Sequence, residues 1–216
     1  MVKIILLRHG YTVMNEASRM CGFSESPLTE KGKIQGNIAC EYIYNNYKVQ
    51  KIVASTLSRA ITTASRLVEL TGLDVITDER LKEQDIGGWE LKTLNEIEEN
   101  YPENYHAWLK DACFVAPVGG ENMVEVFNRS ISAINDYVKE CDQKDGVLVI
   151  VTHGGVVRAL STMLLGKDIS EITSVPWVNN ASITEFDYDN GKCNLIKFGF
   201  DDYLNGLQTK IMSGLK

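Results

Sequence analysis

Residues 3–10 read KIILLRHG, an unbroken apolar run that ends in an arginine, a histidine and a glycine. Such a run, without alternation of polar and apolar residues, is typical of a strand buried on both faces of a parallel sheet. Residues 146–155 read GVLVIVTHGG and have the same layout. Because parallel strands carry their ligand site beyond their carboxyl ends, we expect His9 and His153 to lie at one edge of the sheet. The glycine after each histidine is expected to leave room for a ligand.

Strands and helices alternate along the rest of the chain. Apolar runs predict further strands at residues 51–55 and 74–77, and a hairpin of strands at residues 182–188 and 193–198 around the turn signal Asn190-Gly191. Apolar spacing and capping residues predict helices at residues 29–44, 57–70, 121–141 and 156–165. We therefore expect an α/β fold, a three-layer sandwich with a mainly parallel central sheet flanked by helices.

Residues 81–122 depart from this alternation. They hold Trp89 and Trp108, two of the four prolines and the capping-box sequence TLNE at residues 93–96. We expect a small helical insertion over the carboxyl ends of the strands, with both tryptophans in its core. No linker or repeat sets this segment apart, so the sequence favours a single domain over residues 1–216.

The composition is that of an ordinary globular protein, with 44% hydrophobic and 24% charged residues among 216. A net charge of −7 without a basic stripe argues against nucleic acid as a partner. The five cysteines are scattered and lack metal-ligand spacing, which indicates reduced thiols. No run approaches the roughly 20 apolar residues of a membrane span. We therefore expect a cytoplasmic protein without a membrane partner.

Two arginines join the histidines at the predicted strand ends. Arg8 directly precedes His9, and Arg59 follows the strand at residues 51–55, within the first turns of a helix. A guanidinium group binds phosphate through two donors at once, and a helix N-terminus also favours anions. Two arginines and two histidines at one point therefore predict an anion site, and this much positive charge favours phosphate over carboxylate.

A metal site is the rival interpretation of the same residues. It would combine His9 and His153 with Glu83 or Asp85. The arginines at the strand ends would repel a divalent cation, so the sequence predicts neither a metal nor another cofactor.

Six motifs in order resemble the histidine phosphatase superfamily, also called phosphoglycerate-mutase-like. The resemblance runs from Leu6 to about Phe186 and is closest to the branch of broad-specificity phosphatases and alpha-ribazole phosphatases. The motifs are LLRHG, GFSESPLTEKGKIQG, STLSRAITTA, LKEQDIGGWE, PVGGEN and VTHGG.

The resemblance implies a role for each matching residue. His9 would be the nucleophile that becomes phosphohistidine, and Glu83 would protonate the leaving group and then activate water. The phosphate pocket would be formed by Arg8, Arg59 and His153, with substrate contacts from Asn15, Tyr11 and Gly154. The implied function is a metal-independent phosphomonoester hydrolase acting on a small phosphorylated metabolite.

Several alternatives remain open at this stage. The stretch KEQDIGGWE stands where mutases carry an ERHYG-like sequence, which favours a phosphatase over a phosphoglycerate mutase. The finer alternatives are an alpha-ribazole-5'-phosphate phosphatase and a phospholigand-binding protein that retained the fold. Leu91 replaces the usual glycine after WE, and Tyr11 replaces the common acidic or amide residue after RHG. Glu121 is expected in the first turn of a helix or at the pocket, and a homodimer is one option for assembly.

Overall fold

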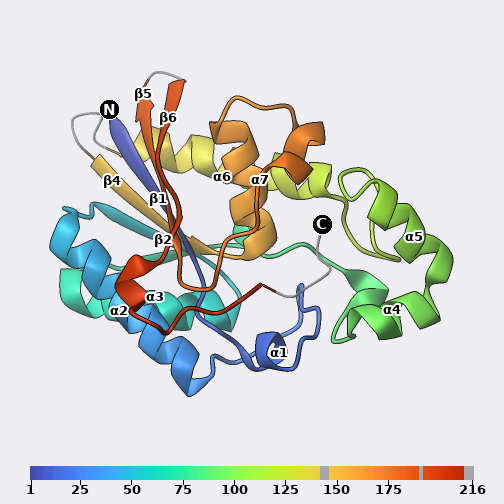
Figure 1. Cartoon of the computed structure of the whole chain (residues 1–216). Coiled ribbons are helices and arrows are strands. Elements are labelled where there is room, and N and C mark those ends of the chain that lie inside the picture. Colours follow the sequence, from blue (N-terminus) through green and yellow to red (C-terminus); the bar gives the residue numbers. More distant parts are fainter. Residues whose placement is uncertain (142–145, 190–191, 212–216) are drawn as a thin grey trace.

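The computed structural model describes residues 1–141, 146–189 and 192–211. A six-stranded sheet in the order β3-β2-β4-β1-β5-β6 crosses the middle of the molecule (Figure 1). The first four strands in this order are parallel to one another, and β5 is antiparallel to both of its neighbours, β1 and β6. The strands are β1 (Val2–Arg8), β2 (Lys51–Ser55), β3 (Val75–Asp78), β4 (Gly146–Thr152), β5 (Ile183–Asp189) and β6 (Lys192–Phe200). The expected mainly parallel sheet is confirmed.

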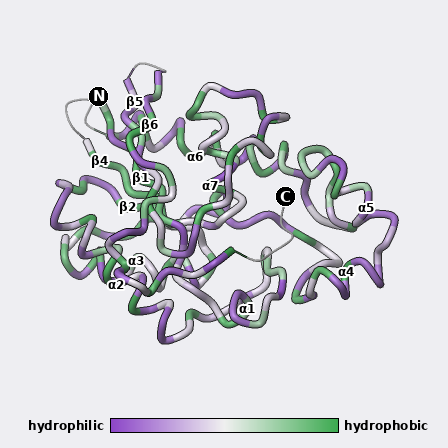
Figure 2. Tube along the Cα trace, in the orientation of Figure 1, coloured by the Kyte–Doolittle hydropathy of each residue, from purple (hydrophilic) through white to green (hydrophobic). Residues whose placement is uncertain are grey.

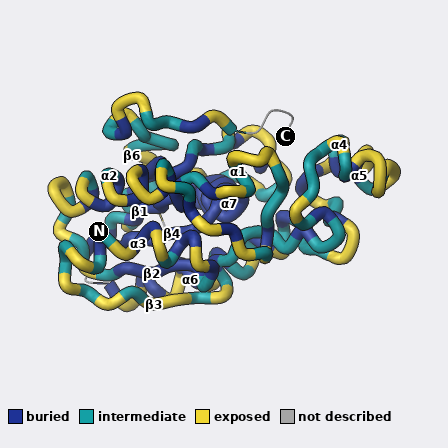
Figure 3. The backbone as a smooth tube through the Cα atoms, turned by 90° about the horizontal axis from the view of Figure 1, so that it is seen from below, coloured by how far each residue is buried: buried dark blue, intermediate teal, exposed yellow. Residues whose placement is uncertain are grey.

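Helices cover both faces of this sheet, which makes three layers (Figure 1). Ile5 and Leu7 of β1 pack with the helices on one face, and Ile4 and Leu6 pack with those on the other. Residues 4–7 of β1 are fully buried on both faces of the sheet, as the unbroken apolar run predicts (Figure 3). Hydrophobic residues gather along the central strands, and the periphery is mostly polar (Figure 2). The first pair of helices is α2 (Glu30–Asn46) and α3 (Ser58–Thr71), and the second is α6 (Met123–Glu140) and α7 (Gly154–Leu164).

The insertion lies to one side of the sheet and forms a small core of its own (Figures 1 and 3). Trp89 is fully buried and meets Trp108 edge-on, with ring centroids 5.4 Å apart, so the prediction of two core tryptophans is confirmed. The regular elements of this segment are short: the 3-10 helices η1 (Glu79–Leu81) and η2 (Gly87–Trp89), then α4 (Leu94–Asn100) and α5 (Pro102–Lys110).

The segment after β1 and the start of α6 differ from the sequence-based expectation. The loop after β1 contains a one-turn helix, α1 (Val13–Glu16), which Thr12 caps through a capping box with Asn15. The helix expected from residue 121 begins at Met123, because Asn122 is its N-cap. Glu121 therefore precedes the helix. The hairpin of β5 and β6 is confirmed, while its turn at residues 190–191 lies outside the described residues.

Two further 3-10 helices complete the chain, η3 (Ile169–Ser174) and η4 (Asp202–Leu204). Among the residues that the structure describes, no helix has the length and apolar character needed to cross a membrane.

Candidate active site

His9 and His153 stand side by side at the carboxyl edge of the sheet. They follow β1 and β4, which are neighbouring parallel strands with Arg8 paired to Thr152. Their ring centroids are 5.1 Å apart, and both residues are buried. The expectation that two strand-end histidines meet is confirmed.

The His9 ring is oriented by the backbone of the next residue. Its Nδ1 atom lies 2.8 Å from the carbonyl oxygen of Gly10, so Nδ1 carries the proton and donates it. The other ring nitrogen, Nε2, then keeps its lone pair. Burial lowers the pKa of His9 well below 6.5, and the nearby positive charges of Arg59 and Arg8 lower it further. The ring is therefore a neutral imidazole, the form that acts as a nucleophile.

The His153 ring is held at both nitrogens. Arg59 donates through Nε to the Nδ1 atom of His153 over 3.1 Å, and the Nε2 atom lies 2.7 Å from the hydroxyl of Ser55. Since Nδ1 accepts, the proton of the neutral ring is on Nε2. Burial lowers the pKa of His153 well below 6.5, with a further contribution from Arg59. Direct contact of His153 with a phosphate would require one of these hydrogen bonds to break.

Arg59 occupies the first turn of α3 and is only 2% exposed. Besides its bond to His153, it donates through Nη1 to the carbonyl oxygen of Ser24 (2.8 Å) and through Nη2 to that of Gly22 (2.6 Å). Three different nitrogens of the guanidinium group are thus tied to fixed acceptors. The plane of the group is set before any ligand arrives.

Arg8 has a donor without an acceptor. Its Nη1 atom donates to the carbonyl oxygen of Val178 over 2.5 Å, whereas its Nε–H is buried and has no hydrogen-bond partner in the described part of the chain. Burial lowers the pKa of Arg8 to about 10; the carboxylate of Glu83 opposes this shift and Arg59 adds to it. A buried donor of this kind costs free energy unless an acceptor reaches it, so this position is suited to an anionic oxygen.

Glu83 comes from the connection between η1 and η2 and reaches the N-terminus of α7. Its carboxylate accepts hydrogen bonds from the backbone N–H of Gly155 (3.1 Å) and of Gln84 (2.9 Å). A Cβ atom on Gly155 would lie 2.4 Å from this carboxylate. The second glycine of the HGG motif therefore makes room for Glu83 at the helix N-terminus.

The segment before Glu83 is fixed by Arg129 of α6. The Arg129 guanidinium donates to the carbonyl oxygens of Arg80 (2.8 Å), Lys82 (2.6 Å) and Glu83 (2.7 Å). Glu121 completes the arrangement, because its carboxylate pairs with Arg129 at 2.9 Å and accepts from the backbone N–H of Asp85. Glu121 is thus neither a first-turn charge of the helix nor a residue that lines the pocket. Its role is to hold the arginine that positions the Glu83 segment.

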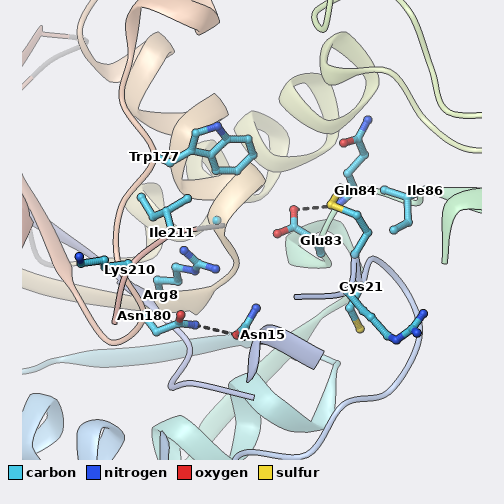
Figure 4. Close-up of a pocket in the computed structure, with 13 residues that line it drawn as sticks. Arg8, Asn15, Cys21, Glu83, Gln84, Ile86, Trp177, Asn180, Lys210 and Ile211 are labelled. Atoms are coloured by element: carbon cyan, nitrogen blue, oxygen red, sulfur yellow. Dashed lines mark hydrogen bonds between the residues drawn. The ribbon is translucent and has the colours of Figure 1, made fainter. Parts of the chain in front are cut away.

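A pocket of about 100 Å³ opens in front of these groups (Figure 4). Of the predicted site residues, Arg8, Asn15, Glu83 and Gly154 line it, while His9, Arg59 and His153 are buried and are not among the lining residues. The side-chain Oδ1 atom of Asn15 accepts from the Nδ2 atom of Asn180 at 3.1 Å, which fixes the Asn15 amide (Figure 4). The remaining lining residues are Arg19, Met20, Cys21, Gln84, Ile86, Trp177, Asn180, Lys210 and Ile211.

Tyr11 is the predicted site residue that the structure places elsewhere, since it is not among the residues that line this pocket. Its backbone N–H donates to Gln35, and its carbonyl oxygen accepts from Thr29. Gly10 also differs from expectation. A Cβ atom there would lie 2.2 Å from the carbonyl oxygen of Gly32. The glycine is therefore required for close packing against α2, and the expectation that it makes room for a ligand is wrong.

Sequence reasoning missed several residues that build the site. Ser55 ends a predicted strand at the same edge as the histidines, so its position was a usable signal. Thr63 accepts from the Gly10 N–H and donates to the Arg59 carbonyl, and Asn180 donates to the carbonyl oxygens of His9 and Gly10. Thr63 lies within the STLSRAITTA motif but was not singled out, and Asn180 lies outside the six motifs. Within the described residues, no group of three or more His, Cys, Asp or Glu side chains is placed to hold a metal ion.

Comparison with protein-family models identifies the family of this chain. The model of the histidine phosphatase superfamily (branch 1) matches residues 4–201. The chain belongs to the histidine phosphatase superfamily. Its enzyme class is that of the phosphatases in this superfamily, because relatives named as phosphatases match it over most of its length.

Two relatives and one solved structure illustrate the similarity. Glucosyl-3-phosphoglycerate phosphatase of Mycobacterium tuberculosis is 36% identical over 189 residues, which cover 85% of this chain and 84% of the relative. Phosphoserine phosphatase 1 of Hydrogenobacter thermophilus is 29% identical over 206 residues, covering 94% and 95%. The structure of mycobacterial glucosyl-3-phosphoglycerate phosphatase with VO3 has a TM-score of 0.83 and 34% identity, covering 91% and 98% of the two chains.

Proposed function

We propose that this histidine phosphatase hydrolyses the monoester of a small phosphorylated metabolite through a phosphohistidine at His9, without a metal ion. Two adjacent groups support this reaction most directly. His9 is a neutral imidazole whose Nδ1–H donates a hydrogen bond to the carbonyl oxygen of Gly10. The Nε–H of the neighbouring Arg8 is a buried donor without an acceptor in the described residues. A nucleophilic nitrogen beside an unused cationic donor is suited to a phosphoryl group.

In the first step, the Nε2 lone pair of His9 attacks phosphorus, and the bond between phosphorus and the ester oxygen breaks. Arg8 and Arg59 stabilise the charge on the transferring oxygens. Among the residues described as lining the pocket, Glu83 is the one with a carboxyl group, so it is the candidate that protonates the leaving alkoxide. The products of this step are the alcohol and phosphohistidine.

In the second step, water attacks the phosphohistidine and the bond between nitrogen and phosphorus breaks. Glu83, ionised after the first step, accepts a proton from the water. Inorganic phosphate leaves, His9 regains its lone pair and Glu83 regains its proton. The hydrogen bond from His9 Nδ1 to Gly10 stays in place through both steps and stabilises the ring when it carries the phosphoryl group.

Trapping the intermediate tests this proposal. The protein is mixed with a phosphomonoester that carries radioactive phosphate and is quenched during turnover. We expect label on His9 that is lost in acid and survives alkali, and none on the His9→Ala variant. If the wild-type protein acquires no such label and turns over no phosphomonoester, the alternative of a phospholigand-binding protein is favoured instead.

The natural substrate follows from a direct comparison. A panel of glucosyl-3-phosphoglycerate, phosphoserine, phosphoglycerates, alpha-ribazole phosphate, sugar phosphates and nucleotides is ranked by kcat/KM. Movement of the phosphoryl group between the positions of a phosphoglycerate is measured in the same assay, since it distinguishes a mutase from a phosphatase. The tested ester with the highest kcat/KM identifies the substrate class.

The compartment and the assembly belong to the same proposal. The described cysteines, Cys21, Cys40, Cys113, Cys141 and Cys193, form no disulfide. Free thiols are usual in the reducing cytoplasm, which supports the cytoplasmic location. A homodimer remains an option, and the mass of the protein in solution decides it.

A further inference from the structure

One peptide group joins Arg59 to a carboxylate of the insertion. It is the peptide between Gly22 and Phe23 in the loop that follows α1. Its carbonyl oxygen accepts from Nη2 of Arg59 at 2.6 Å, and its N–H donates to the carboxylate of Glu90 at 2.6 Å. The two charged side chains therefore hold opposite ends of the same peptide dipole.

Glu90 binds more of this loop than one peptide. Its other carboxylate oxygen accepts from the N–H of Gly22 at 3.1 Å, and the N–H of Ser24 lies 3.4 Å from the first. Three successive backbone N–H groups thus point at one carboxylate. The carbonyl oxygens of Gly22 and Ser24 point the other way, to Arg59. Residues 22–24 therefore lie between the Glu90 carboxylate and the Arg59 guanidinium.

The segment of residues 22–24 has little freedom to shift. A Cβ atom on Gly22 would lie 2.2 Å from the carbonyl oxygen of Gln84 and 2.7 Å from the carboxylate of Glu90. The loop is also tied to α3, because the backbone N–H and hydroxyl of Ser58 donate to Glu25. Displacement of the Glu90 carboxylate would therefore move the carbonyl oxygens that fix the Arg59 guanidinium.

Hydrogen bonds to charged groups are stronger than neutral ones, and bonds at the two ends of one peptide strengthen each other. The Glu90 carboxylate makes the Gly22 carbonyl oxygen a better acceptor for Arg59. We propose that Glu90 is a positioning residue that sets the orientation of Arg59 for the oxygens of the phosphoryl group. This role rests on the proposed function, in which Arg59 belongs to the phosphate pocket.

The test is a double-variant cycle read by affinity for orthovanadate and by kcat/KM for nitrophenyl phosphate. Glu90→Gln keeps the shape of the side chain, but an amide cannot accept hydrogen bonds on both of its end atoms. We expect Glu90→Gln to weaken orthovanadate binding about tenfold in the wild-type background. In the Arg59→Lys background, the same change should weaken binding at most about twofold. Glu98→Gln, on the exposed surface of α4, is the matched control and should keep wild-type values.

Equal losses in the two backgrounds would overturn the proposal, because a residue that only stabilises the fold would act independently of Arg59. Wild-type affinity in Glu90→Gln would also overturn it. If Glu90→Gln does not fold, Glu90→Asp replaces it; its shortened carboxylate should weaken binding, and coupling to Arg59→Lys decides in the same way. If the wild-type protein turns over no phosphomonoester, the proposed function fails, while the vanadate titrations still decide the role of Glu90.

Discussion

The Nε atom of Arg59 donates a hydrogen bond to the Nδ1 atom of His153 over 3.1 Å, and both residues are buried. This contact is compatible only with an imidazole that is unprotonated at Nδ1. Burial and the charge of Arg59 accordingly lower the pKa of His153 well below 6.5, and the same causes lower the pKa of His9. The folded protein therefore excludes a second proton from both rings.

These lowered pKa values make stability depend on pH. Below about pH 6.5 the unfolded chain protonates both imidazoles and the folded chain does not, so acid favours unfolding. Each histidine should remove about 1.4 kcal/mol of unfolding free energy per pH unit, from about pH 6.5 down to its folded pKa. Above about pH 6.5 neither contributes a slope.

Urea unfolding at about pH 7.5 and about pH 5.5 measures this slope. His153→Asn keeps polar groups toward Arg59 and Ser55 without a titrating ring, so it should show the smaller acid loss. His106→Asn on the exposed surface of α5 is the matched control. An unchanged slope in His153→Asn would show that its pKa is not lowered by folding.

Leu91 is a second site where a specific change has a predictable effect. It has a φ of 61°, in the left-handed region, and its side chain is 42% exposed. A non-glycine residue pays roughly 1–2 kcal/mol in this region, and glycine loses about 0.4–1 kcal/mol to its freer unfolded chain. Leu91→Gly should therefore raise the free energy of unfolding by about 0.5–1 kcal/mol. Leu91→Ala keeps the strain and is the control in urea unfolding; lower stability of Leu91→Gly would contradict the assignment of strain.

The left-handed backbone also explains a sequence difference. The family resemblance implies glycine after WE, and this chain has Leu91 there. The Leu91 N–H donates to the Met20 carbonyl oxygen, and its own carbonyl oxygen accepts from Arg19. The backbone of Leu91 is thus held by Arg19 and Met20, two residues that line the pocket. Leu91 follows Glu90 directly and does not line the pocket. The replacement of glycine by Leu91 therefore concerns the geometry of this turn rather than direct contact with substrate.

The strand-end part of the site could be predicted from the sequence, and the part from the insertion could not. His9 and His153 follow apolar runs whose burial fixes their ends, so topology alone brings them together. Glu83 follows a 3-10 helix that has no apolar period, and only the resemblance to a family pointed to it. The hydrogen bonds of Arg129 to the carbonyl oxygens of residues 80–83 and the packing of Gly10 on Gly32 join segments far apart in sequence. Contacts of that kind leave no local pattern.

Arg129 should control the position of Glu83 without touching substrate. Arg129→Lys keeps the charge, but a single ammonium group cannot reach three carbonyl oxygens and Glu121 together. We expect kcat for alkyl phosphates to fall about tenfold, and kcat for nitrophenyl phosphate, which needs little proton donation, to fall less. Arg66→Lys, on the exposed surface of α3, is the control. Equal losses on both esters would indicate general destabilisation instead.

Replacement of Glu83 tests its proposed role as proton donor most directly. Glu83→Gln keeps the contacts to the backbone N–H groups of Gln84 and Gly155 in part, but removes the group that can donate a proton. Hydrolysis of alkyl phosphates should fall about 100-fold or more, since general acid catalysis contributes at least that much. Nitrophenyl phosphate has a good leaving group and should lose far less, and labelled phosphohistidine should still form from it. Glu103→Gln on the exposed surface of α5 should behave as wild type. A common loss factor for both esters would remove Glu83 from the acid role and leave the proton donor to be found among other groups at the pocket.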